Sequence, residues 1–170
     1  MERNSSMPES RKRTEKERGR ESQADSAAQN AAAESGKDET SAEGLDERVR
    51  LALHAASEKK AHDLVVLDLR EVASFTDYFV IASGTNVRQV QAIADEVQEQ
   101  LRKRLGVKPA RVEGYKSAEW VLLDYGDFIF HVFEEKSRRF YDLERLWRDA
   151  ARVAIPPDVA GGGGFLRNER

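Results

Sequence analysis

A strand followed by a helix is expected in residues 78–106, YFVIASGTNVRQVQAIADEVQEQLRKRLG. The apolar run from Tyr78 to Ala82 predicts the strand, and the cluster Ser83-Gly84-Thr85-Asn86 is typical of a turn and a helix cap. One helix face is traced by Val90, Ile93, Ala94, Val97, Leu101 and Leu105. Gly106, with Pro109 shortly after it, indicates where the helix ends.

Further strands and helices are expected on both sides of this stretch. Leu45 to about Lys60 has helical apolar spacing, and the nearly continuous apolar run 63–69 predicts a strand buried on both faces. Short strands are expected at 111–113, 119–124 and 128–133, with a tight hairpin at 125–127, and a C-terminal helix at about 140–150. The predicted fold class is therefore α/β (α+β), a mixed sheet of about five strands covered by helices.

One folded domain with two tails is expected. Residues 1–43 contain no Val, Ile, Leu, Phe, Tyr or Trp, so they predict a disordered charged N-terminal extension. The α/β domain is predicted at 44–153. Residues 154–170 include four consecutive glycines, Gly161 to Gly164, and predict a flexible C-terminal tail.

The composition limits the classes of partner and chemistry. The chain has 170 residues, 35% charged, with a formal net charge of -3, which argues against simple binding of nucleic acid through excess positive charge. It has no cysteine, so disulfides and cysteine-ligated metal sites are excluded. Apolar runs are too short for a secretory signal or a membrane span, so we expect a cytoplasmic protein with no membrane partner.

The turn Ser83-Gly84-Thr85 is the best candidate for an enzyme site. Nucleotidyltransferases use a glycine-serine turn between a strand and a helix, where backbone N–H groups bind phosphate. Such enzymes also need closely spaced carboxylates on a following strand to hold a divalent metal. Here Asp95 and Glu96 lie on the helix instead. We therefore interpret the turn as a helix cap and expect no enzyme activity, catalytic residue, metal or cofactor.

Other polar candidates also have simpler structural explanations. Asp124 and Asp127 flank the hairpin and could be a metal pair, but Asp and Gly are what a tight turn requires. His131 alternates with apolar neighbours on the last strand and has no Ser or Cys partner motif, and His54 and His62 belong to no recognisable group. We expect structural roles for all of them.

Trp120 is the best candidate for binding another macromolecule. Strand alternation puts Trp120, Leu122 and Asp124 on one side of the segment, and Glu119, Val121 and Leu123 on the other. Tryptophan is frequent among residues that dominate interface energy, and an edge strand carrying one could serve as a docking surface. A core position for Trp120 is an equal alternative on the pattern alone, whereas Trp147 on the last helix is expected in the core.

Several ordered blocks of the chain resemble the ribosomal silencing factor family, also called the Iojap or RsfS family. They are 74–85 (SFTDYFVIASGT), 92–95 (AIAD), 112–114 (VEG), 119–127 (EWVLLDYGD), 131–132 (HV) and 141–147 (YDLERLW). The resemblance covers about residues 45–152. It implies a nucleotidyltransferase-like sheet, often in a homodimer. The N-terminal extension and glycine-rich end are outside the family pattern.

The resemblance also implies a partner and a function. The family binds the large ribosomal subunit through universal large-subunit protein fourteen, blocks joining of the small subunit and represses translation in starvation or stationary phase. By position, Trp120 matches the docking tryptophan, with Glu119, Leu122, Asp124 and Tyr125 as neighbouring contacts. No direct sequence-specific nucleic-acid binding is expected. The alternatives are a nucleotidyltransferase-like enzyme and a large-subunit assembly factor that binds ribosomal RNA.

Overall fold

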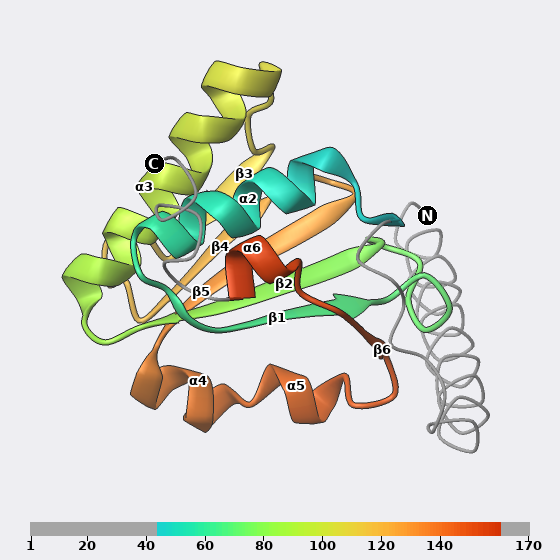
Figure 1. Ribbon diagram of the computed structural model, residues 1–170. Helices are drawn as coiled ribbons and strands as arrows, with labels where there is room; N and C mark the ends of the chain where they lie inside the picture. The colour runs from blue at the N-terminus through green and yellow to red at the C-terminus, as the bar shows by residue number, and fades with distance from the viewer. Residues whose placement is uncertain (1–43, 161–170) are drawn as a thin grey trace, which may run out of the picture.

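The computed structural model describes residues 44–160, which form one six-stranded mixed sheet with helices on both faces (Figure 1). The elements in chain order are α2 (Glu47–Glu58), β1 (His62–Asp68), β2 (Tyr78–Gly84), α3 (Val87–Leu105), β3 (Arg111–Glu113), β4 (Trp120–Asp124), β5 (Phe128–Glu134), α4 (Glu135–Tyr141), α5 (Leu143–Leu146), β6 (Ala151–Val153) and α6 (Pro157–Ala160). The fold class predicted from the sequence is confirmed. The predicted tails at 1–43 and 161–170 lie outside the described residues.

The strand order across the sheet is β3-β4-β5-β2-β1-β6. β2 and β5 pair in parallel at its centre, and every other neighbouring pair is antiparallel. The long helix α3 makes the crossover out of β2, as a parallel pair requires. β2 and β5 are the strands buried on both faces.

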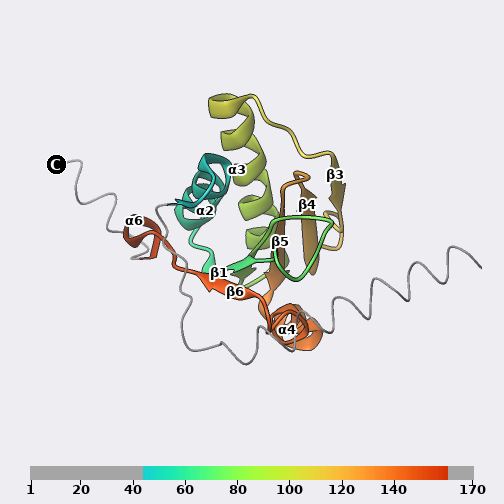
Figure 2. The ribbon, with the colours of Figure 1, turned by 90° about the vertical axis from the view of Figure 1, so that its right-hand side faces the viewer.

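Two apolar cores lie on opposite faces of the sheet. Helices α2 and α3 cover one face, and α4 and α5 run across the other (Figures 1 and 2). Alternate residues of one strand enter different cores: in β4, Val121 packs under α2 and α3, whereas Trp120 and Leu122 face α4 and α5. The strand alternation predicted around Trp120 is therefore confirmed.

The first two helices begin and end where their residues predict. The side chain of Asp46 accepts a hydrogen bond from the backbone N–H of Arg48 at 2.8 Å, and that of Asn86 accepts one from Gln89 N–H at 2.9 Å. Gly106 ends α3 in the left-handed conformation, at φ 65°. The prediction of a helix cap in the Ser83–Asn86 cluster is confirmed at Asn86. The prediction that Ser83 and Gly84 belong to the turn was wrong, because both residues pair with β5 as the end of β2.

The prediction that the strand at 63–69 is buried on both faces was wrong for its first half. Val66 and Leu67 are buried, but Asp63 is exposed and Leu64 and Val65 are only half-buried. The reason is position: β1 lies next to the edge strand β6, which pairs only with residues 66–68.

The predicted single C-terminal helix at 140–150 was also wrong. Asp142 takes the left-handed conformation, φ 48°, and divides the segment into α4 and α5. Asp adopts this conformation more readily than most residues. Packing also continues past the predicted boundary at 153, because Pro157–Ala160 forms α6 and its Val159 is buried against the α2 side. β6 was not predicted and raises the sheet from about five strands to six.

Candidate functional site

Trp120 is half-buried at the start of β4, where it contacts three aromatic rings. Its ring stacks on Phe133 at a centroid distance of 4.9 Å and lies 4.8 Å from Tyr141. Its indole Nε1–H donates a hydrogen bond to Nδ1 of His131 at 3.0 Å. β4 is not the edge strand expected from the sequence, because β3 pairs with residues 122–124, but Trp120 itself lies just beyond that ladder.

His131 lies beneath Trp120 in the α4–α5 core and is only 3% exposed. Its ring is nearly perpendicular to that of Phe79, 4.6 Å away. Burial lowers the pKa of His131 to about 3, so the imidazole is neutral at physiological pH. The structural role expected for His131 agrees with this position.

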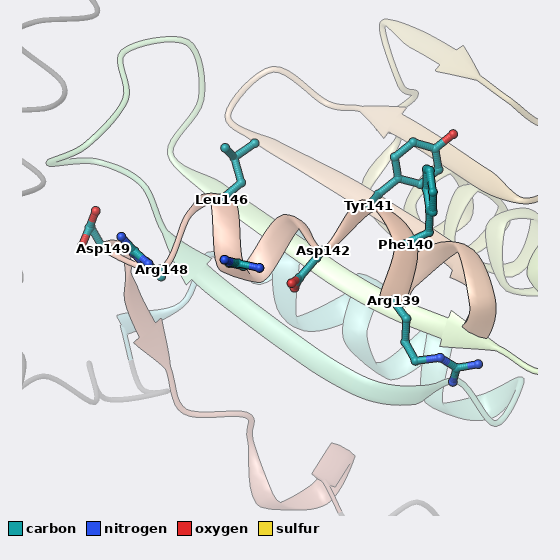
Figure 3. Close-up of a pocket in the computed structure, with 8 residues that line it drawn as sticks. Arg139, Phe140, Tyr141, Asp142, Leu146, Arg148 and Asp149 are labelled. Atoms are coloured by element: carbon teal, nitrogen blue, oxygen red, sulfur yellow. The ribbon is translucent and has the colours of Figure 1, made fainter.

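Large apolar side chains of α4 and α5 face water, and one of them, Tyr141, contacts Trp120. Phe140 is 81% exposed, Leu146 71% and Tyr141 48%. Phe140 contacts Tyr141 edge to face at 5.1 Å, and Figure 3 shows Phe140, Tyr141 and Leu146 projecting on the same side of the two helices. We call Trp120, Phe140, Tyr141 and Leu146 the apolar strip. Phe140 and Leu146 were not among the binding residues predicted from the sequence, where they counted only toward the apolar spacing of a C-terminal helix.

Charged side chains border the apolar strip. A shallow groove along α4 and α5 is lined by Arg139, Phe140, Tyr141, Asp142, Arg145, Leu146, Arg148 and Asp149 (Figure 3). Arg139, Arg145 and Arg148 are exposed, and none of them forms an ion pair with another residue in 44–160. Arginine and aromatic side chains are both enriched at protein interfaces. This surface therefore has the composition of an interface with a polar rim.

The other residues predicted beside Trp120 do not share one surface. Glu119 is exposed next to it, and Leu122 is half-buried on the same face of β4. Asp124 accepts a hydrogen bond from Gly126 N–H at 2.9 Å and so stabilises the hairpin turn. Tyr125 is buried on the opposite face of the sheet, where its ring stacks on Phe128 at 4.8 Å. Of these residues, Leu122 lies with Trp120 on the α4–α5 side of β4.

Replacing Tyr125 with Phe should stabilise the fold by about 1 kcal/mol, because the buried hydroxyl oxygen has no hydrogen-bond partner. Burial also raises the pKa of Tyr125 to about 12, whereas the unfolded value is near 10. The contribution of Tyr125 to stability is therefore present below pH 10 and lost as the pH rises toward 12. Urea unfolding from pH 8 to pH 11.5 should show a smaller alkaline loss in Tyr125→Phe. An unchanged alkaline slope would contradict this assignment.

The turn considered for nucleotide binding is occupied by the protein's own side chains. Ser83 Oγ accepts a hydrogen bond from Arg138 Nη1 at 2.8 Å, and Ser83 is only 1% exposed. A Cβ at Gly84 would lie 3.0 Å from Val90 Cγ2, so this glycine allows α3 to pack closely on β2. Thr85 N–H donates to Gln89 Oε1 at 2.7 Å. These contacts explain the turn without a phosphate ligand.

The carboxylates considered for metal binding have separate partners. Asp127 pairs with Arg48 at 2.7 Å, whereas Asp124 pairs with Arg111 at 3.5 Å. Asp95 accepts a hydrogen bond from Tyr115 Oη at 3.0 Å, and Glu96 accepts one from Gln100 at 2.9 Å. In residues 44–160, no three His, Asp or Glu side chains gather as metal ligands would.

The two remaining histidines, His54 and His62, each face a glutamate. His54 lies 2.9 Å from Glu58, and His62 lies 3.9 Å from Glu135. These are pairs rather than larger ligand groups. No helix within the described part of the chain is long and apolar enough to cross a membrane.

Comparison with known proteins gives one consistent family. The model of the family described as "Ribosomal silencing factor during starvation" matches residues 41–163. Ribosomal silencing factor RsfS of Halalkalibacterium halodurans is 40% identical over 109 residues, which are 64% of this chain and 92% of that protein. An X-ray structure from Chromobacterium violaceum is 37% identical, with a TM-score of 0.58, over 65% of this chain and 88% of that one.

A more distant relative carries a different name. The mouse protein called "Mitochondrial assembly of ribosomal large subunit protein 1" is 30% identical over 93 residues, which are 53% of this chain and 40% of that protein. The family match, by contrast, extends over all of the residues that the structure describes. This chain belongs to the ribosomal silencing factor family.

Proposed function

We propose that this protein binds the large ribosomal subunit in the cytoplasm and prevents the small subunit from joining it. The proposed contact is universal large-subunit protein fourteen, and the proposed outcome is repression of translation in starvation or stationary phase. The observation that supports this most is the apolar strip, an exposed aromatic surface beside a half-buried tryptophan in a member of this family. Contiguous exposed apolar surface with a polar border is typical of protein interaction sites.

The residues of the apolar strip differ in what they would contribute to binding. Phe140 and Leu146 bury only a small part of their side chains in the fold. Most of their apolar area is therefore free for a partner. Trp120 and Tyr141 contact each other and supply the aromatic anchor. Glu119, exposed beside Trp120, and the three arginines at 139, 145 and 148 would form the polar rim.

The proposed mechanism is steric and needs no reaction. The two ribosomal subunits must approach closely over a wide area, and a rigid domain held on one of them keeps the other away. The free energy of binding to the large subunit is enough to exclude the small subunit. We therefore propose no nucleotide, metal or catalytic step. In the structure, residues 83–86 make hydrogen bonds to the protein's own Arg138 and Gln89.

In the absence of ribosomes, a second copy of the chain could cover the apolar strip. We therefore propose a homodimer for the free protein. Exposed apolar patches that meet across a twofold axis bury the same residues on both subunits. Addition of large subunits would then compete with the dimer for one surface.

The test is sedimentation of purified large and small subunits with magnesium, with and without the full-length protein. We expect the protein to travel with the large subunit and the joined-ribosome peak to shrink. Protein that stays at the top of the gradient, with joining unaffected, would overturn the proposal.

One alternative has a specific observation behind it. The mouse relative is named for assembly of the mitochondrial large subunit, so a role in subunit maturation deserves a separate arm of the experiment. Depletion of the protein in growing cells should leave large-subunit precursors unchanged if silencing is the main role. Accumulated precursors, together with normal joining of mature subunits, would favour the assembly function.

A further inference from the structure

His131 occupies a position where an apolar ring would be expected to pack better. It lies in the α4–α5 core, between Phe79 and Phe133, and its Nε2 is buried without a hydrogen-bond partner. A neutral imidazole has one N–H, and Nδ1 accepts the hydrogen bond from Trp120, so the proton is on Nε2. A buried N–H without an acceptor destabilises a fold, so this histidine has a local energetic cost.

The compensating feature is the acceptor at Nδ1. The indole of Trp120 also contacts the rings of Phe133 and Tyr141, but its N–H donates to neither of these residues in the structure. Without Nδ1, the indole N–H would be satisfied only by turning toward water. The 3.0 Å hydrogen bond therefore determines which edge of the indole faces the core and which edge faces solvent.

We propose that His131 is a positioning residue that holds the Trp120 indole in the orientation needed to dock on the large ribosomal subunit. This inference rests on the function proposed above. His131 itself is 3% exposed, so it reaches no partner directly and acts only through Trp120. Its buried, unsatisfied Nε2 is the energetic cost of providing Nδ1 as the acceptor.

If His131 positions Trp120, replacing it should weaken binding without lowering the free energy of unfolding. A purely structural residue would affect both together. His131→Phe removes both the acceptor and the unsatisfied N–H. We expect this variant to be as stable as the wild type or more stable, but to bind large subunits about three- to tenfold more weakly, the effect of one lost hydrogen bond. His131→Asn can place its Oδ1 near the position of Nδ1. We expect Asn to restore binding toward the wild-type value although it packs less well.

The hydrogen bond has its own spectroscopic readout. The full-length chain has two tryptophans, so ¹⁵N-labelled protein gives two indole N–H signals, and Trp147 serves as the internal reference. We expect the Trp120 signal to exchange slowly with solvent in the wild type and in His131→Asn, and faster in His131→Phe. If His131→Phe does not fold, His131→Leu removes the same acceptor with a smaller side chain.

The outcomes distinguish this inference from the proposed function. Faster indole exchange with weaker binding, both reversed by Asn, would support it. Unchanged exchange in His131→Phe would overturn it, as would faster exchange with undiminished binding while the apolar-strip substitutions still abolish binding. A wild-type protein that does not bind large subunits would overturn the proposed function and the docking role together, whatever the exchange data show.

Discussion

The double substitution Phe140→Asp, Leu146→Asp should weaken binding to the large ribosomal subunit about a hundredfold or more. Both side chains are mostly exposed, at 81% and 71%, so the fold loses little packing when they change. In the proposed complex, each new carboxylate would be buried against an apolar surface without a partner, which is strongly unfavourable. The measurement is sedimentation of the variant with purified large subunits, followed by the subunit-joining assay.

A matched control adds the same charge elsewhere. Val87 and Val112 are also exposed, at 47% and 39%, and lie on α3 and β3 rather than on α4 or α5. Val87→Asp, Val112→Asp therefore changes the net charge equally, and we expect it to bind like the wild type. Urea unfolding should place both variants within about 0.5 kcal/mol of the wild type. Equal loss of binding in the two double variants would show that charge, and not the apolar strip, is responsible.

Gly114→Ala should reduce the free energy of unfolding by about 3 kcal/mol or more. Gly114 follows β3 with φ 77°, a conformation that disfavours any residue with a Cβ. A Cβ there would lie only 2.0 Å from the carbonyl oxygen of Trp120, so the backbone itself must move. The displaced atom belongs to Trp120, whose docking role is proposed above, and we expect large-subunit binding to fall together with stability. Urea unfolding and sedimentation would measure the two effects.

Gly106→Ala is the matched control for the backbone conformation. Gly106 also has a positive φ, 65°, but a Cβ there would meet no atom within 4 Å. We expect a loss of about 1–2 kcal/mol, the cost of the left-handed conformation for a residue with a side chain. Similar losses in both variants would mean that the contact with Trp120 relaxes easily, contrary to the prediction.

The long helix was predicted correctly because both its apolar spacing and its terminal residues indicated it. For α3, apolar residues at helical spacing agree with Asn86 as its cap and Gly106 at its end. The segment from Phe140 to Ala150 had apolar spacing alone. A helical period does not reveal that Asp142 adopts φ 48° and divides the segment, nor that Phe140 and Leu146 lie at the surface. β6 has only three residues, too few for a period of two to stand out.

The candidate site was predictable where strand alternation determines the face. Trp120 and Leu122 are on the side of β4 that the alternation indicated. Tyr125 lies one residue past β4, and the same alternation, continued by that residue, places it with Val121 and Leu123 in the opposite core. The hydrogen bond from Trp120 to His131 joins two strands, and its register depends on the hairpin. The spacing of Trp120 and His131 in the sequence therefore did not predict this hydrogen bond.

The attachment of α4 and α5 to the sheet affects how fast and how tightly they can bind. β5 at the sheet's centre precedes this segment, and β6 at its edge follows it, so both ends are held by strands of one sheet. Between them, Arg138 connects to Ser83 of β2 and to Glu144 of α5, each at 2.8 Å. The proposed binding surface is thus preorganised. Little chain entropy would be lost on docking, and the encounter would require correct orientation but no coupled folding.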